Sequence, residues 1–115
     1  MTECYHNSGW KKSFGFKHNP KGKRYIGQFD LFEHGDRFEI WSLGIRERYQ
    51  NKGYGTQMLT EFLAQFKSDK PLYLYVYKTN EIAIKLYEKV GFVIVDDYPY
   101  GSYAYTMQYK GKEAS

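Results

Sequence analysis

Gln50-Asn51-Lys52-Gly53-Tyr54-Gly55 is the stretch around which this chain is organised. This Q-x-x-G-x-G run lies between an apolar segment with strand character and a segment with helical spacing. Glycine adopts backbone angles that a Cβ forbids, and free N–H groups at a helix N-terminus offer an anion hydrogen-bond donors and the positive end of a dipole. The run therefore predicts a cradle for the phosphates of a ligand, with a plain turn as the alternative.

Two other phosphate-binding motifs do not fit this stretch. A Walker loop requires G-x-x-x-x-G-K-[ST], and the segment Gly53-Tyr54-Gly55-Thr56 lacks both that spacing and the lysine followed by a hydroxyl residue. A dinucleotide fingerprint requires G-x-G-x-x-G, whereas no third glycine follows as far as Met58. A nucleoside triphosphatase and a dinucleotide-binding enzyme are both disfavoured.

Length and composition restrict the class of protein further. A chain of 115 residues is long enough for one domain with a single site. No apolar run approaches the roughly 18 to 20 residues of a membrane span, and no apolar segment follows the basic N-terminus, so we expect a soluble, cytoplasmic protein without a membrane partner. Cys4 is the only cysteine and the three histidines are scattered, so we expect no disulfide and no metal site.

Basic residues are concentrated near the N-terminus. Six of the first 24 residues are lysine or arginine, and one is acidic. We expect a single domain over residues 1–115, with a basic arm over 1–23, a core over 24–109 and a tail over 110–115. The arm is suited to steer toward a nucleotide, an acidic protein or an RNA-linked acceptor, or it is only a solvated surface.

Hydrophobic periodicity predicts the secondary structure. Helices are expected over residues 54–66 and from the N-cap Asn80 to the stop at Gly91. Alternating or continuous apolar and aromatic residues predict the strands, and the tyrosine-rich segment 72–77 is expected to be covered on both faces. The predicted strands are residues 12–17, 25–32, 37–45, 72–77, 92–95 and 102–109. This order of elements predicts an α/β fold with helices packed on a mixed sheet.

Two motifs in this order resemble those of the GNAT superfamily of N-acetyltransferases. The first run matches the acetyl-CoA motif [QR]-x-x-G-x-[GA], and the segment from Asn80 to Phe92 matches N-x-x-A-x-x-L-Y-x-x-x-G-F. The resemblance covers about residues 24–109. It implies a mixed, mostly antiparallel central sheet with helices on its faces. It also implies transfer of an acetyl group from acetyl-CoA to a primary amine, on a protein lysine, a protein N-terminus or a small molecule.

The resemblance also implies which residues bind the donor. The strand that ends at Leu43-Gly44-Ile45 separates from its neighbour and offers free backbone groups to the pantetheine arm. The N–H groups of the glycine loop hold the pyrophosphate, Lys52 adds charge, and Asn80 faces the pantetheine. The implied donor-binding residues are Leu43, Gly44, Ile45, Gln50, Asn51, Lys52, Gly53, Tyr54, Gly55, Thr56 and Asn80.

The transfer requires a base for the amine and an acid for the departing thiolate. By resemblance, Tyr87 is the candidate acid, with a buried packing tyrosine as the alternative. Glu39 lies where histone acetyltransferases carry their general base, although a surface glutamate fits the same alternation. The next strand has Tyr75 where acetyltransferases of protein N-termini often carry a glutamate, which weakens a protein N-terminus as the acceptor.

The chain departs from the family pattern upstream of the core. Family members usually spend fifty or more residues on a first strand and two helices that wall the acceptor site, whereas about twenty residues precede the strand at Tyr25. We therefore expect these N-terminal helices to be truncated, with either an open groove for a bulky acceptor or a homodimer that completes the site. The competing function is a non-catalytic protein that binds CoA or a partner, including an inhibitor, on the same fold.

Overall fold

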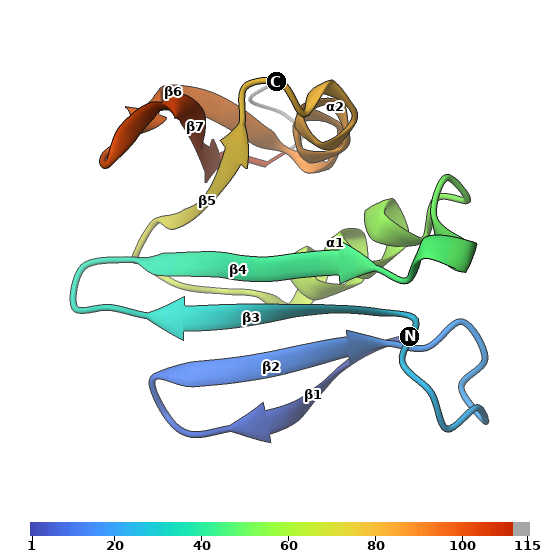
Figure 1. The fold of residues 1–115 in the computed structure, drawn as a ribbon. Helices are drawn as coiled ribbons and strands as arrows, with labels where there is room; N and C mark the ends of the chain where they lie inside the picture. Colours follow the sequence, from blue (N-terminus) through green and yellow to red (C-terminus); the bar gives the residue numbers. More distant parts are fainter. Residues whose placement is uncertain (112–115) are drawn as a thin grey trace.

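The computed structural model describes residues 1–111, which form one seven-stranded sheet and two α-helices (Figure 1). The predicted strands and helices are present with their ends shifted by three residues or fewer, and most of the predicted tail lies outside the described residues. In chain order the elements are β1 (Thr2–Asn7), β2 (Lys11–Phe16), β3 (Gly27–Glu33), β4 (Phe38–Ile45), the 3-10 helix η1 (Glu47–Tyr49), α1 (Tyr54–Gln65), β5 (Leu72–Tyr77), α2 (Glu81–Val90), β6 (Phe92–Tyr98) and β7 (Gly101–Tyr109).

The sheet opens between its two parallel strands. The strand order is β1-β2-β3-β4-β5-β7-β6, and only β4 and β5 run parallel. Their ladder ends with the pair Ile40 and Leu74, although β4 continues to Ile45 and β5 to Tyr77. Figure 1 shows β5 turning away from β4 toward β7 and α2. The strand separation that the resemblance implies is therefore present, and it leaves edge backbone groups of both strands without a strand partner.

A bulge in β4 marks the point where the two strands part. The register with β3 shifts between the pairs Gln28–Gly44 and Asp30–Trp41, so two β4 residues lie opposite one β3 residue. Ser42, inside the bulge, has a φ of 57°, which is uncommon for a residue other than glycine. Because a bulge bends its strand and redirects the side chains that follow, it helps to carry the end of β4 away from β5.

The two faces of the sheet differ in what covers them. The helices α1 and α2 share one apolar core with the β5 residues Leu72, Leu74 and Val76. The tyrosines that alternate with these residues lie on the opposite face, where Tyr77 is 62% exposed. The prediction that residues 72–77 are covered on both faces is wrong, because tyrosine suits a half-exposed strand face as well as a buried one.

Both helices begin and end where local chemistry favours it. The Asn80 side chain caps α2 by accepting a hydrogen bond of 3.2 Å from the Ala83 N–H, and Gly91 follows the helix with a φ of 114°. The buried residues of α1 recur at spacings of one, three and four and are Gly55, Met58, Leu59, Phe62 and Leu63. Among the described residues, no helix has the length and apolar character needed to cross a membrane.

The N-terminal segment departs most from its prediction. The residues expected to form a basic arm instead form the antiparallel hairpin of β1 and β2, which extends the sheet beyond β3. The alternation that marks a strand is weak in β1 because this edge strand has only exposed or half-buried side chains. The lysines therefore lie on a hairpin and on the loop over residues 17–26. Within residues 1–111, two strands and no helix precede β3.

Candidate active site

The Q-x-x-G-x-G loop joins the free end of β4 to the N-terminus of α1. Gln50 ties the loop to the strand, since its Nε2 donates a hydrogen bond of 2.9 Å to the Ile45 carbonyl. Asn51 and Gly53 have φ values of 62° and 83°, both in the left-handed region. Alternation of left-handed and ordinary residues gathers successive N–H groups toward one point, which is how backbone nests bind anions.

The loop offers a set of free hydrogen-bond donors. Within residues 1–111, the backbone N–H groups from Asn51 to Thr56 have no acceptor, and the first satisfied N–H of α1 is that of Gln57, at 3.0 Å from the Gly53 carbonyl. The first turn of α1 has no acidic residue and no side-chain cap, so the positive end of its dipole is uncompensated. Lys52 is exposed and forms no ion pair within the same residues. These features fit a phosphate group.

The second glycine of the motif brings α2 close to the loop. A Cβ on Gly55 would lie 3.0 Å from Leu86 Cδ1, so a larger residue would require the Leu86 side chain to shift. The first glycine serves the backbone instead, because Gly53 has open space around it and a φ that other residues rarely adopt. The two glycines of Q-x-x-G-x-G are therefore required for different reasons, Gly53 for its backbone angle and Gly55 for close packing.

The candidate acid Tyr87 lies in a cavity of about 230 Å³ that opens beside the separated strands. The residue is 9% exposed, and burial raises the pKa of its phenol above the ordinary value. A phenol with a raised pKa stays protonated at neutral pH and remains able to donate a proton. Asn80 also lines this cavity, so the second predicted motif contributes both of its proposed site residues to one place.

The candidate base Glu39 is a buried carboxylate held by three side chains. The Tyr75 hydroxyl donates to Oε2 at 2.5 Å, Trp41 Nε1 donates to Oε1 at 2.9 Å, and His34 Nε2 lies 3.1 Å from Oε1. Burial acts to raise the pKa of Glu39, but these hydrogen bonds outweigh it and bring the pKa below its ordinary value. Burial and the bond to Glu39 together raise the pKa of Tyr75 strongly. Glu39 is therefore ionised and Tyr75 protonated at neutral pH.

Glu39 and Tyr87 lie in neighbouring cavities that share a wall. Glu39 lines a cavity of about 440 Å³ with His34, Arg37 and other residues. This cavity and the cavity of Tyr87 have three lining residues in common, which are Trp41, Tyr75 and Tyr98. A donor beside Tyr87 and an acceptor beside Glu39 would thus meet at this aromatic wall.

The remaining predicted donor residues lie at the strand end and on the loop. Gly44 and Ile45 line a cavity of about 250 Å³ between β3 and β4, while Leu43 packs against the core. Arg46 fixes the start of the loop, since its Nε donates to the Tyr25 carbonyl at 3.0 Å. The sequence analysis did not single out the wall residue Tyr98. The register of β6 on β7 brings it there, and no sequence motif reports that register.

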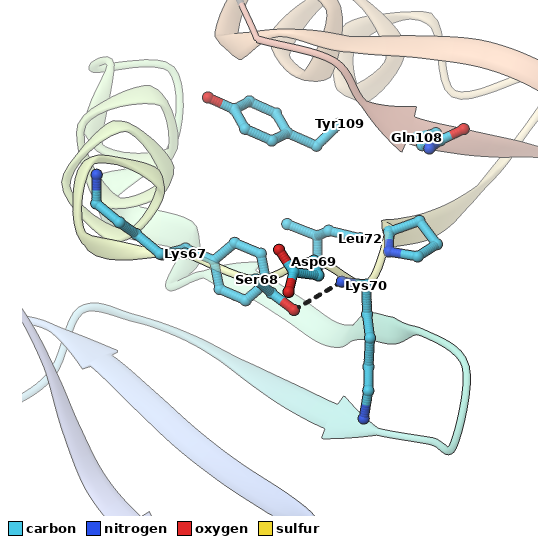
Figure 2. A pocket seen from close by; sticks show the side chains of 9 residues that line it. Lys67, Ser68, Asp69, Lys70, Leu72, Gln108 and Tyr109 are labelled. Carbon is cyan, nitrogen blue, oxygen red and sulfur yellow. Dashed lines mark hydrogen bonds between the residues drawn. The ribbon is translucent and has the colours of Figure 1, made fainter.

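A larger cavity, of about 940 Å³, lies elsewhere. It lies where the loop after α1 passes the end of β7, and its lining includes Lys67, Asp69 and Tyr109 (Figure 2). Figure 2 shows the Lys70 N–H bound to the Ser68 hydroxyl, at 3.0 Å, on one side of this hollow. None of its lining residues belongs to the predicted site, so size alone does not identify the functional cavity. Among residues 1–111, no three His, Cys, Asp or Glu side chains are placed to hold a metal ion.

Comparison with known proteins identifies related domains. The model of the acetyltransferase (GNAT) family matches residues 5–92. The spermine/spermidine N(1)-acetyltransferase of Bacillus subtilis is 43% identical over 51 residues, which make up 42% of this chain and 34% of that protein. The curated relatives that the chain matches are covered over only 20% to 39% of their own lengths.

Solved structures share the fold at low sequence identity. The IAA acetyltransferase of Bacillus cereus superposes with a TM-score of 0.72 at 21% identity, covering 87% of this chain and 77% of that one. The PaiA N-acetyltransferase of Thermoplasma acidophilum, in complex with coenzyme A, gives a TM-score of 0.68 at 23% identity, with 87% and 60% covered.

Proposed function

The chain belongs to the GNAT acetyltransferase family, and from this premise we propose that it transfers an acetyl group from acetyl-CoA to a primary amine within a ternary complex. The observation that carries the proposal is the opening between β4 and β5, with the free N–H groups of the glycine loop at the end of β4. The PaiA relative whose structure contains coenzyme A supports the choice of donor.

The donor would be held mainly by backbone groups. The N–H groups from Asn51 to Thr56, with Lys52 beside them, bind the pyrophosphate, and Gln50 keeps the loop in position through its bond to Ile45. The unpaired edge of β4 after the bulge, at Leu43-Gly44-Ile45, binds the amide groups of the pantetheine arm. Asn80 uses its oxygen to cap α2, which leaves its amide N–H groups for the same arm.

The reaction requires two proton transfers, one to Glu39 and one from Tyr87, which lie in the two cavities that share the aromatic wall. The acceptor nitrogen, once neutral, attacks the thioester carbonyl carbon, and the new C–N bond replaces the C–S bond. Glu39 takes the proton that the amine loses, directly or through a water, and Tyr87 donates a proton to the departing sulfur. The products are an acetylated amine and free CoA thiol. Exchange with solvent then returns a proton to Tyr87 and removes the proton that Glu39 accepted. The acetyl thioester supplies the activated acyl group.

The assay that tests this proposal combines binding with turnover. Acetyl-CoA at a hundred times its Kd should stabilise the protein by about 2.7 kcal/mol, which a thermal-shift titration detects. Mass spectrometry of a panel of primary amines, including lysine peptides and polyamines, then reports acetylation. Stabilisation without any acetylated product would favour a non-catalytic CoA-binding protein. No stabilisation would reject both the acetyltransferase and the CoA-binding protein and would leave a protein that binds a partner on this fold.

Variants separate the two catalytic roles from the binding role. Tyr87→Phe removes only the phenol oxygen and should lower kcat by about 100-fold while leaving the acetyl-CoA Kd unchanged, because an acid typically contributes about 10² to 10⁴ to the rate. Glu39→Gln should lower kcat/KM for the amine by a similar factor. A Tyr87→Phe enzyme with the wild-type kcat would remove Tyr87 from the mechanism.

A further inference from the structure

A row of six aromatic side chains crosses the face of the sheet that no helix covers. It starts at Trp41 and Tyr75, whose ring centroids are 5.2 Å apart, and continues from Tyr75 to Tyr98 at 5.0 Å. From Tyr98 it branches to two further rings at 5.5 and 5.9 Å. The members of this aromatic row are Trp41, Tyr75, Tyr77, Tyr98, Tyr100 and Tyr103.

These rings do not belong to the apolar core. None of them is among the side chains that form or line the core, and Tyr100, Tyr77 and Tyr103 are 84%, 62% and 55% exposed. Single exposed aromatic residues are common, but a contiguous set of this kind marks a binding surface. The row also forms much of the two cavities that hold Glu39 and Tyr87.

The charge at one end of the row selects the ligand. Glu39 has a carboxylate with capacity for about four hydrogen bonds and accepts three, so it retains capacity for one more. Two cations lie close to the row, Arg37 in the wall of the Glu39 cavity and Lys78 beside Tyr77, and each is paired with a carboxylate of its own. The Arg37 guanidinium pairs with Asp36 at 3.3 Å and lies over the Tyr73 ring, and Lys78 pairs with Asp97 at 2.9 Å. His34, which also lines the Glu39 cavity, is the partner of Glu39 itself.

We propose that the aromatic row and Glu39 form the acceptor site and that it binds an alkylammonium group, with the faces of the rings around the cation and the carboxylate as its counter-charge. Aromatic faces attract a cation through their quadrupole, and an anion beside them adds to that attraction. The same rings would stack nucleobases, but a buried carboxylate repels the phosphates that accompany them, so RNA is the disfavoured ligand. The role of this site as the acceptor site rests on the proposed function. The binding of an alkylammonium group there does not depend on it.

The test uses a cation that cannot become an amide and a neutral molecule of the same shape. Choline carries a positively charged quaternary nitrogen, and 3,3-dimethylbutan-1-ol has a neutral quaternary carbon in the same place. Trp10→Phe leaves Trp41 as the sole tryptophan, since the chain has two, and Trp10 lies at the other edge of the sheet from β6. Titration followed by Trp41 fluorescence should give a choline Kd about 3 to 30 times lower than that of the alcohol. Equal affinities would overturn the proposal.

Substitutions in the row provide the second arm. Tyr100 is 84% exposed, so Tyr100→Leu should fold normally. The double variant Tyr98→Leu, Tyr100→Leu should reduce the preference for choline over the alcohol by about three-fold or more. Glu39→Gln should do the same, whereas Tyr5→Leu, an exposed tyrosine on β1, should change nothing. A preference that survives all three substitutions in the site would overturn the assignment, as would tighter binding of a short single-stranded RNA than of choline.

The outcomes for this site and for the proposed function are distinguishable. Selective binding of choline by a protein that acetylates no amine would reject the acetyltransferase and retain the cation site. Acetylation of amines by a protein that does not distinguish choline from the alcohol would retain the acetyltransferase and reject the cation site.

Discussion

On one side of the opening between β4 and β5, the groups available to a ligand are backbone N–H groups of the glycine loop and the start of α1. On the other side they are side chains of the aromatic row and Glu39. The first side is built from one continuous segment of chain, and the second collects residues from four strands and a turn. A backbone cradle tolerates changes of side chain but not of φ, whereas a side-chain wall depends on each ring.

The largest effect should come from a change of φ on the donor side. Gly53→Val places a β-branched residue at a φ of 83°, where the left-handed conformation costs about 1 to 2 kcal/mol, and the loop should relax away from the geometry that presents its N–H groups. We expect the acetyl-CoA Kd, measured by calorimetry, to rise about ten-fold. Choline binding on the acceptor side should stay unchanged.

Gly53→Asn is the matched control, because asparagine tolerates the left-handed region and Asn51 already adopts it. No atom lies within 4 Å of a Cβ at this position, so neither variant introduces a clash. Equal losses of affinity in the two variants would show that side-chain bulk, and not backbone angle, governs the donor side.

The two sides also differ in how far the sequence predicted them. The donor side could be predicted because Gln50 to Thr56 and Asn80 to Phe92 are continuous motifs whose spacing reports local backbone geometry. The acceptor side depends on register: Glu39 lies opposite Tyr73 in the short parallel ladder, and this pairing brings its carboxylate to Tyr75. Spacing suggested Glu39 as the base. No local sequence pattern predicts the three side chains that contact its carboxylate, or that the candidate acid and base lie in two neighbouring cavities.

The N-terminal hairpin is a second region that the sequence did not predict. β1 pairs along β2 through backbone groups, and its side chains contribute little to the core. A strand held in this way lacks the apolar alternation on which prediction depends, so it was expected to be part of an arm. Backbone pairing is invisible in a sequence unless burial accompanies it.

A smaller effect should separate two roles of Asn80. Asn80→Ala removes the cap of α2 and should lower the free energy of unfolding by about 1 kcal/mol, measured with urea. Asn80→Asp keeps an oxygen for the Ala83 N–H and should retain that stability, but it loses the amide N–H groups proposed to face the pantetheine. If Asn80→Asp binds acetyl-CoA as tightly as the wild type, the residue only caps the helix and the donor side is limited to the loop.

The smallest effect concerns stability on the acceptor side. The pKa of Glu39 is lowered in the folded protein from an ordinary value of 4.5, so its ionised form is favoured by folding. This stabilisation is fully present above about pH 4.5 and is lost as the pH falls through the folded pKa. The difference in unfolding free energy between the wild type and Glu39→Gln should therefore narrow as the pH is lowered through this range. The effect is small because burial opposes the hydrogen bonds.

Tyr75→Phe sharpens this measurement, because it removes the shortest of the three hydrogen bonds to Glu39 and keeps the carboxyl group. The pKa of Glu39 should rise in this variant, so the loss of stability on acidification should begin at a higher pH than in the wild type. Stability curves that keep the same pH dependence in both proteins would show that Tyr75 does not hold the charge of Glu39. In that case Tyr75 would not position the Glu39 carboxylate, and ligand recognition by the aromatic row would depend on the shape of its side chains alone.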